Sequence, residues 1–293
     1  MTQKNYINKD IKICLCVIAK NENLYAREFV EHYKKIGYNN IFIYDNNEKN
    51  GEHFEEVIND YIQNGFVKII NYRKINWASP QHFAYQDCYM KNNKLYNWLS
   101  FYDMDEFLEL NKKYKTIQDF LQDKIFDNCQ NIKINRIEII NRNILYYENK
   151  SLAERIKPFK DNYSPDIRIK STYRGNITVN YWKKSCNPHT SSLNITSCSS
   201  SGKITKFNSP YVIPPVLENA KLNHYYYKSF EEYCLKNKRG QADRPKDLNK
   251  KIVNENFKNL YLESKNDSKK LKILYKIFND SLDNISENQI NFF

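Results

Sequence analysis

Two aspartates separated by one residue, Asp103 and Asp105, follow a short apolar run over residues 98–102. Side chains two residues apart in extended backbone point to the same side, because a strand has a period of two. Two such carboxylates supply the oxygen ligands that Mg²⁺ and Mn²⁺ prefer, and these ions keep open positions for substrate phosphates. The spacing therefore indicates an enzyme that handles a nucleotide diphosphate. The alternative is an acidic turn whose second Asp is there by chance.

The segments before these aspartates predict the elements that position them. The predicted strands are residues 11–18, 40–44, 66–70 and 98–102. Helix patterns lie between them, over residues 23–35, 52–63 and 79–93. This alternation predicts a parallel sheet with right-handed crossovers, and ligands of such sheets bind beyond the carboxyl ends of the strands. We therefore expect three polar loops, residues 20–22, 45–47 and 103–105, to converge on one cleft.

The chain is less regular after residue 110. We expect a short helix over 116–122, a strand with one wet face over 132–139, strands over 167–170 and 176–182, a Ser-rich loop or lid over 185–202, a helix from Ser229 and an amphipathic helix over 268–282. No Pro- or Gly-rich linker divides the chain. We expect one α/β domain over residues 1–245 and a basic helical extension over 246–293, packed on that domain or at a membrane surface.

Composition restricts the partners. The formal net charge of +12 favours an anionic partner, such as a nucleotide, a phosphorylated lipid or an acidic membrane surface. Lys and Arg are spread along the chain without a long basic block, so nucleic acid is the least favoured partner. No apolar run reaches the roughly 18 residues that a membrane-spanning helix needs. We expect a cytoplasmic protein, with peripheral contact at the inner face of the plasma membrane.

Cysteine usage indicates neither zinc nor a redox motif, since there is no Cys-x-x-Cys. Five cysteines lie in apolar patterns and are expected to be buried free thiols. They are Cys14, Cys16, Cys88, Cys129 and Cys234.

Four segments carry a family resemblance. They are residues 19–22 (AKNE), 44–47 (YDNN), 101–107 (FYDMDEF) and 224–232 (HYYYKSFEE). Together they resemble glycosyltransferases of the GT-A fold, specifically the family-92-like and related family-2-like group. Each motif alone is weak, but their order and spacing over about residues 11–241 are specific. The resemblance implies a Rossmann-like, mostly parallel central sheet flanked by helices.

The resemblance also implies a nucleotide-sugar site. Ala19, Asn21, Glu22 and Asp45 would lie at the base and ribose of the donor, where carboxylate and amide oxygens suit hydroxyl and ring N–H groups. The alternative is that these loop residues only cap helices.

The same resemblance implies a metal site. Asp103 and Asp105 would hold a Mn²⁺ or Mg²⁺ ion that bridges the diphosphate, and Asp103 can serve the ribose instead. His224 is the candidate third ligand, and His189, in the Ser-rich segment, is the alternative ligand. Neutral imidazole suits Mn²⁺ better than Mg²⁺.

Cations and a base complete the implied site. Lys170 and Lys228 would contact the diphosphate and offset the charge that develops on the leaving group. A reaction that inverts the anomeric centre needs a general base. Glu231 and Glu232 are the candidates, although the capping-box spacing from Ser229 explains Glu232 equally well. Asp166 and Asp243 stay open as alternatives.

These residues lead to one expected function and two alternatives. The expected function is transfer of a hexosyl unit from a UDP-sugar to a hydroxyl of a bacterial surface glycan, such as lipopolysaccharide or capsule. The resemblance suggests galactose and inversion. One alternative is a nucleotidyltransferase, which would normally carry a Gly-rich phosphate loop in place of residues 19–22. The other is a catalytically silent nucleotide- or glycan-binding protein.

Overall fold

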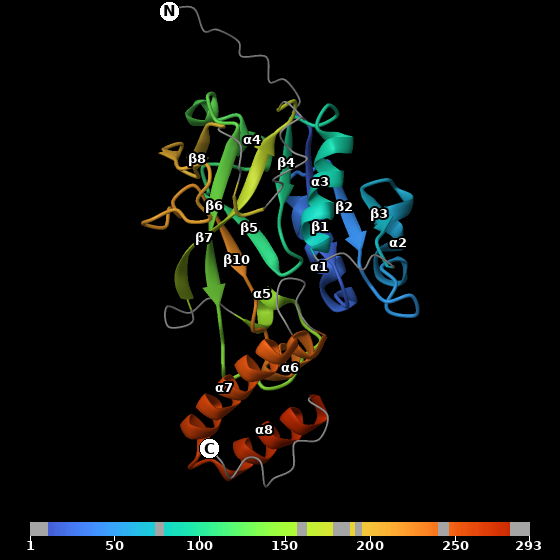
Figure 1. Cartoon of the computed structure of the whole chain (residues 1–293), viewed down its shortest axis with the longest axis vertical. Coiled ribbons are helices and arrows are strands. Elements are labelled where there is room, and N and C mark those ends of the chain that lie inside the picture. The colour runs from blue at the N-terminus through green and yellow to red at the C-terminus, as the bar shows by residue number, and fades with distance from the viewer. Residues whose placement is uncertain are drawn as a thin grey trace, which may run out of the picture. The chain divides into compact units, whose positions relative to one another are not determined.

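The computed structural model describes residues 11–73, 79–156, 163–177, 188–190, 195–239 and 246–281 (Figure 1). Their contacts form two compact units. The first contains Met1–Ile137 and Pro165–His224, and the second contains Glu138–Ser164 and Tyr225–Phe293. This division lies earlier in the chain than the boundary that we expect at residue 245. The reason is that Ile140, Leu145 and the helix after Ser229 share an apolar core with the carboxyl-terminal helices.

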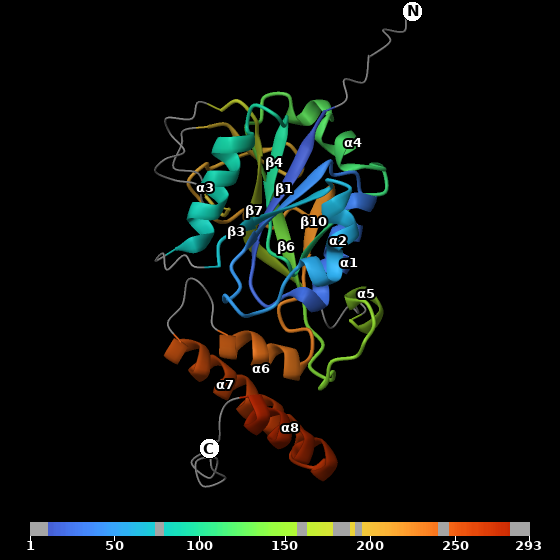
Figure 2. The same cartoon turned by 90° about the vertical axis from the view of Figure 1, so that its right-hand side faces the viewer.

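The first unit begins with the predicted parallel strands. They are β1 (Ile13–Ala19), β2 (Asn40–Asp45), β3 (Val67–Asn71) and β4 (Trp98–Phe101), and β1 pairs in parallel with β2 and β4, as β2 does with β3. The connecting helices are α1 (Asn23–Lys35), α2 (Glu55–Gln63) and α3 (Pro80–Asn92). Figure 2 shows α3 on one face of the sheet and α1 with α2 on the other. Strand β1 is apolar throughout because helices cover both of its faces.

Antiparallel strands extend this sheet. They are β5 (Glu106–Leu110), β6 (Asn131–Ile139), β7 (Tyr163–Arg174) and β10 (Ala220–His224). Two short strands, β8 (Ser197–Ser199) and β9 (Ile204–Thr205), join at its side. The order is β3-β2-β1-β4-β7-β6-β10-β5, in which β4 is antiparallel to β7 and β5 to β10. A short helix, α4 (Ile117–Leu121), precedes the 3-10 turn Lys124–Phe126.

Several predictions from the local sequence pattern differ from the observed sheet. The predicted wet face of β6 is wrong, since the strand is buried on both faces between β7 and β10. The sequence pattern also gives no sign of β5, β9 or β10. The predicted Ser-rich loop contains β8 in its described part. The predicted strand over 176–182 lies almost entirely outside the described residues.

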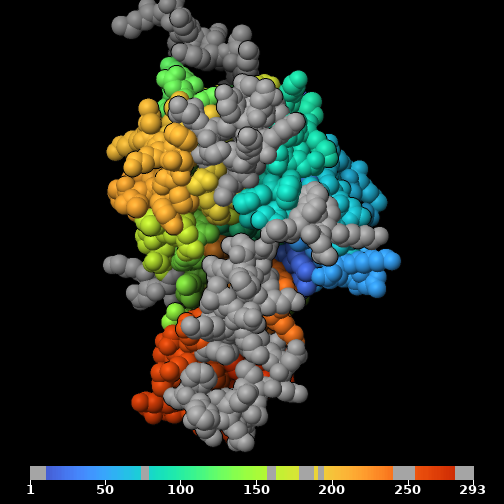
Figure 3. Space-filling view, viewed as in Figure 1, coloured from blue at the N-terminus to red at the C-terminus, as the bar shows by residue number. Residues whose placement is uncertain are grey.

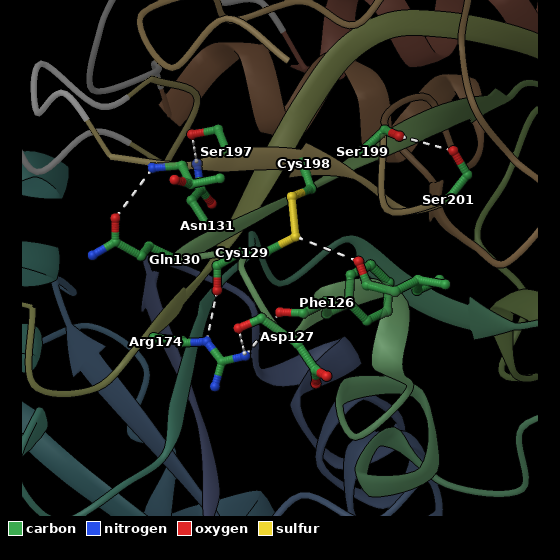
Figure 4. Close-up of a disulfide and its surroundings, with 12 residues drawn as sticks. Phe126, Asp127, Cys129, Gln130, Asn131, Arg174, Ser197, Cys198, Ser199 and Ser201 are labelled. Atoms are coloured by element: carbon green, nitrogen blue, oxygen red, sulfur yellow. Dashed lines mark hydrogen bonds between the residues drawn. A yellow bond between two sulfur atoms is a disulfide. The ribbon is translucent and has the colours of Figure 1, made fainter. Parts of the chain in front are cut away.

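One predicted free thiol is wrong. Cys129 forms a disulfide with Cys198 across a sequence separation of 69 residues (Figure 4). The bond connects the turn before β6 to β8. Cys198 of β8 is also the strand partner of Ile132 on β6. Arg174 supports the same turn by donating to the Cys129 carbonyl at 2.6 Å. An apolar sequence context cannot show that two distant cysteines meet. The buried Cys14, Cys16, Cys88 and Cys234 form no disulfide and remain thiols, as predicted.

The second unit is helical. Its helices are α5 (Leu152–Arg155), α6 (Phe230–Arg239), α7 (Lys246–Ser264) and α8 (Ser268–Ser281). The predicted amphipathic helix is therefore present as α8, while α7 is not expected from the pattern. Leu274, Ile277 and Phe278 of α8 are buried with Phe230 and Phe257. No described helix is long and apolar enough to cross a membrane.

Candidate functional site

The loops after β1 and β2 are joined at the carboxyl ends of these strands. The Asn21 N–H donates to Asn47 Oδ1 at 2.6 Å, and the Asn46 N–H donates to the Ala19 carbonyl at 2.9 Å. Asn21 has a φ of +52°, a left-handed conformation that Asn adopts more readily than most residues. Glu22 is buried, and its carbonyl accepts the first backbone hydrogen bonds of α1. The structure thus brings the predicted residues 19, 21 and 22 to the loop that follows Asp45.

Asp45 is buried, and both of its carboxylate oxygens have partners. Oδ1 accepts the Asn47 N–H at 3.0 Å, and Oδ2 accepts Nε–H of Arg73 at 2.7 Å. Arg73 also donates to the carbonyls of Glu48 and Glu52, so one guanidinium holds several parts of this loop. Asp45 therefore shapes the loop after β2. The nucleotide contact expected for it stays a prediction.

Asp103 lies between helix α3 and strand β7. Its Oδ1 accepts hydrogen bonds from Gln81 Nε2 at 2.9 Å and from the Tyr85 hydroxyl at 3.3 Å. Its Oδ2 accepts from Lys170 Nζ at 2.6 Å. Burial alone would raise the pKa of Asp103, but the Lys170 ammonium holds that pKa below its usual value. With 34% of its side chain exposed, Asp103 presents an ionised carboxylate to solvent.

A network of buried ion pairs holds the loop of Asp103 in place. Glu106, which is fully buried, accepts the Asp103 N–H at 3.0 Å and lies 3.5 Å from Lys170 Nζ. Its other oxygen lies 3.3 Å from Arg136, which pairs with Asp166 at 2.6 Å. Burial raises the pKa of Glu106 against the opposing charges of Lys170 and Arg136. The network fixes the loop that carries both predicted metal ligands.

Asp105 and His224 come together as the resemblance implies. His224 Nε2 lies 3.6 Å from Asp105 Oδ1, and both side chains are buried. The pairing of β10 with β5 places His224 opposite Glu106, the residue next to Asp105. Carboxylate and imidazole are donors that suit Mn²⁺ better than Mg²⁺. Asp103 does not complete the set as it lies, because Lys170 holds its Oδ2. In the described part of the chain, no three His, Cys, Asp or Glu side chains form a metal-binding group.

His189 lies beside β7, at the backbone of Ile169. Its Nδ1 is 2.7 Å from the Ile169 carbonyl, which fits a ring that donates through Nδ1–H. Burial, with the nearby charge of Lys170, lowers the pKa of His189 to about 4. The ring is therefore neutral at pH 7, which is the form that binds metals.

The two predicted base candidates belong to the second unit, where both have structural partners. Glu232 forms a capping box with Ser229 and accepts two hydrogen bonds from Arg155, at 2.8 and 3.0 Å. Glu231 accepts the Tyr147 N–H at 2.8 Å. The capping alternative for Glu232 is therefore the one that its geometry favours.

Lys228 also belongs to the second unit. It is buried, has a φ of +56° and directly precedes the cap of α6 at Ser229. Its contact with a diphosphate stays a prediction.

The two alternative base candidates are Asp166, which the structure describes, and Asp243, which it does not. Asp166 pairs with Arg136 and Arg168. Although burial opposes it, these partners hold the pKa of Asp166 far below its usual range, which makes it a weak base. Asp243 lies outside the described residues.

Sequence reasoning missed two arginines that organise the site. Arg73 pairs with Asp45, and Arg136 pairs with Glu106. Arg136 lies in the alternating stretch of β6, where a charged residue reads as part of a wet face. No local signal identifies it, because the burial of both faces of β6 becomes visible only in the assembled sheet.

A parallel sheet that delivers an Asp-x-Asp pair and polar loops at its strand ends defines a GT-A-type glycosyltransferase. The particular family follows from comparison with known proteins. The model of glycosyltransferase family 92 matches residues 9–273, and the chain belongs to this family. The resemblance and the fold class predicted from the sequence are thereby confirmed.

Curated relatives carry the same family name. A family 92 protein of Oryza sativa subsp. japonica is 29% identical over 119 residues, which cover 41% of this chain and 20% of that protein. A family 92 protein of Arabidopsis thaliana is 27% identical over 97 residues, which cover 33% of this chain and 16% of that protein. The matched part of the chain thus spans a fifth or less of these relatives.

Solved structures to which this chain is similar include S. aureus TarS 1-349. The complex of that protein with UDP has 11% identity and a TM-score of 0.40, covering 96% of this chain and 78% of that one. The complex with UDP-GlcNAc has 11% identity and a TM-score of 0.37, covering 93% and 80%.

Proposed function

We propose that this glycosyltransferase moves a hexosyl unit from a UDP-sugar to a hydroxyl of a glycan, with a divalent metal ion held by Asp105 and His224. The observation that carries the proposal is the cluster at the carboxyl ends of β1, β2 and β4. There an ionised and partly exposed Asp103 lies beside a buried carboxylate–imidazole pair. Galactose as the sugar and inversion as the stereochemical course belong to the proposal through the family resemblance.

A bound Mn²⁺ or Mg²⁺ would neutralise charge on the departing diphosphate. Asp105 and His224 are the donor groups for that ion, and substrate phosphates with water would fill its other positions. Asp103 accepts hydroxyl groups well because its carboxylate is ionised and fixed by Gln81 and Lys170, which suits the ribose of the donor. The Lys170 ammonium adds positive charge beneath the diphosphate.

The acceptor hydroxyl must lose its proton during transfer. Both predicted bases belong to the second unit, where Glu232 binds Arg155 and caps α6 and Glu231 accepts the Tyr147 N–H, so the identity of the base stays a prediction. The glycan itself is less defined. The plant relatives give no support to a bacterial lipopolysaccharide or capsule acceptor, which stays a prediction. The family match removes the reason to consider a nucleotidyltransferase.

The first experiment measures UDP release from a panel of UDP-sugars, with and without Mn²⁺. We expect metal-dependent release from one donor in the wild type, and a loss of about 100-fold or more in Asp105→Asn and in His224→Ala. Asp60→Asn is the matched control, since Asp60 is an exposed carboxylate on α2 that pairs with Arg27.

Absence of UDP release from every donor, together with absence of UDP binding by calorimetry, would contradict the proposal. UDP binding without release in the presence of acceptor glycans would point instead to a silent nucleotide-binding protein.

A further inference from the structure

The segment after β9 exposes apolar side chains at the surface of the first unit. Tyr211 is 45% exposed and Ile213 is 73% exposed. Figure 3 shows this segment, coloured yellow to orange, as part of the outer surface. Tyr211 and Ile213 are two residues apart, so both can belong to one binding surface.

This segment pairs with the strand that serves the candidate site. Tyr211 is the antiparallel partner of Arg168 on β7. The Val212 N–H donates to the Ile167 carbonyl at 2.9 Å, and the Ile169 N–H donates to the Pro210 carbonyl at 3.2 Å. The pairing continues the edge of β7 beyond the point where β4 stops, at the pair Phe101 and Ser171. The loop with Asp103 leaves the sheet at that same point.

Strand geometry places Tyr211 on the face of β7 that carries the site. Directly opposed residues of an antiparallel pair project to the same face, so Tyr211 projects with Arg168. Arg168 in turn projects with Lys170, two residues along the strand and about 7 Å away. Lys170 is the residue whose ammonium binds Asp103. Tyr211 therefore projects to the same side of β7 as Lys170, the strand residue that contacts the proposed donor site.

Buried polar side chains of β6 hold this segment in one conformation. Lys133 is fully buried and donates to the carbonyls of Lys206, Phe207 and Ser209, at 2.5, 3.3 and 2.6 Å. Asn135, also buried, donates to the Val212 carbonyl and accepts the Val216 N–H. Burying an ammonium and an amide is costly unless every such bond is made.

These hydrogen bonds fix a loop in which Tyr211 and Ile213 nevertheless stay exposed. A surface fixed in advance binds a ligand without the entropic cost of ordering the loop. The buried anchors therefore point to a binding role for the exposed side chains that they support.

Arg168 gives the surface a polar component. Its side chain is 50% exposed, and Nε–H donates to Asp166 at 2.8 Å, which fixes the plane of the guanidinium. Arg136 binds the other side of Asp166 and extends the network to Glu106 and Lys170. A positioned guanidinium beside an aromatic ring matches a pyranose, which has an apolar C–H face and a rim of hydroxyl groups.

We propose that Tyr211, Arg168 and Ile213 form the acceptor subsite and receive a pyranose ring of the acceptor glycan. The Tyr211 ring stacks on the C–H face, Ile213 extends the apolar platform, and Arg168 donates to ring hydroxyls. This inference rests on the proposed glycosyltransferase function, because it names the substrate class that the second half of the site accepts.

The test measures ligand binding directly, so that it does not depend on turnover. The probes are methyl β-galactopyranoside, methyl β-glucopyranoside and methyl α-mannopyranoside, examined by saturation-transfer NMR in the presence of UDP and Mn²⁺. We expect saturation transfer to at least one glycoside, weakened about tenfold by Tyr211→Ala and several-fold by Arg168→Gln. Tyr211→Phe keeps the ring and should retain binding. Ile204→Ala, at an exposed apolar residue of the preceding strand β9, is the matched control.

The affinity for UDP, measured by calorimetry, separates this inference from the proposed function. We expect Tyr211→Ala to leave UDP affinity within about twofold while glycoside binding is lost. Saturation transfer to none of the glycosides, or equal transfer in the wild type and Tyr211→Ala, overturns the subsite. Failure of the wild type to bind UDP overturns the donor site instead, and the glycoside measurement still decides whether Tyr211 binds a pyranose.

Discussion

Single residues at the candidate site divide into those that the sequence could identify and those that it could not. Asp103, Asp105 and His224 lie in motifs, and the structure brings Asp105 and His224 to 3.6 Å. Lys170 also binds the Asp103 carboxylate directly, a contact that the sequence does not indicate. Arg136 belongs to no motif. Its role depends on which strands become neighbours, and that information is not local.

Lys170 provides the sharpest prediction at this scale, because its buried ammonium serves both Asp103 and Glu106. We expect Lys170→Met to lower the free energy of unfolding by about 3–5 kcal/mol, since removing one partner leaves buried carboxylate charge without compensation. Urea denaturation measures this change. Lys91→Met removes an ammonium from an exposed pair with Asp87 and should cost less than about 1 kcal/mol. Equal effects of the two substitutions would show that the buried network does not stabilise the fold.

At the scale of elements, local pattern predicts the parallel half of the sheet and fails in the antiparallel half. β1 to β4 are short, mostly apolar runs separated by helices of ordinary length, so their composition and order define them. β5 begins directly after the Asp-x-Asp loop, and β10 contains alternating polar residues such as Lys221 and Asn223. These strands exist because they pair with each other across more than a hundred residues, which no short window of sequence reveals.

The contact between α1 and β5 should make stability depend on pH. His32 Nε2 lies 2.9 Å from the Leu108 carbonyl, and burial lowers the pKa of His32 below 6.5. Because the unfolded chain binds the proton more readily, this site favours folding above about pH 6.5 and disfavours it as pH falls. We expect His32→Gln to flatten the pH dependence of the unfolding free energy between about pH 5 and 7.

Tyr33→Phe is the control for this measurement. It removes hydrogen bonds to the same strand, at Glu106 O and Leu108 N, but it adds or removes no group that titrates in this range. It should lower stability by about 1–2 kcal/mol at every pH. A pH dependence of His32→Gln identical to that of the wild type would exclude His32 as the titrating group.

The disulfide gives a prediction for the connection between β6 and β8. Joining Cys129 to Cys198, which are 69 residues apart in sequence, should contribute about 4 kcal/mol by restricting the unfolded chain. We expect the double variant Cys129→Ser with Cys198→Ser to lose most of this stability in chemical denaturation. Reductant should lower the stability of the wild type and leave the double variant unchanged. An equal response to reductant in both proteins would assign the effect to another cysteine.

At the scale of the whole molecule, the features that bear on catalysis differ from those that bear on the location of the protein. The sheet carries the proposed donor site, whereas the net charge of +12 and the disulfide bear on the surroundings in which the protein works. Disulfides persist mainly in oxidising compartments, which weighs against the cytoplasmic location expected from composition. The charge still favours an anionic surface, and the exposed Lys269, Lys272 and Lys276 of α8 make that helix a candidate for the contact.

The way α8 is packed determines what kind of membrane contact is available. Its apolar side chains Leu274 and Phe278 are buried in the core of the second unit, so they cannot insert between lipids without opening that core. Binding must then be electrostatic and screened by salt. We expect the protein to sediment with vesicles of phosphatidylcholine and phosphatidylglycerol at about 0.05 M NaCl and to be released at about 0.5 M, with no binding to phosphatidylcholine alone. Replacing the three exposed lysines by glutamate should abolish sedimentation, because the glutamates repel the anionic lipids. The buried apolar core of the second unit is left unchanged by these substitutions. Vesicle binding that survives about 0.5 M salt would mean that α8 leaves its core and inserts.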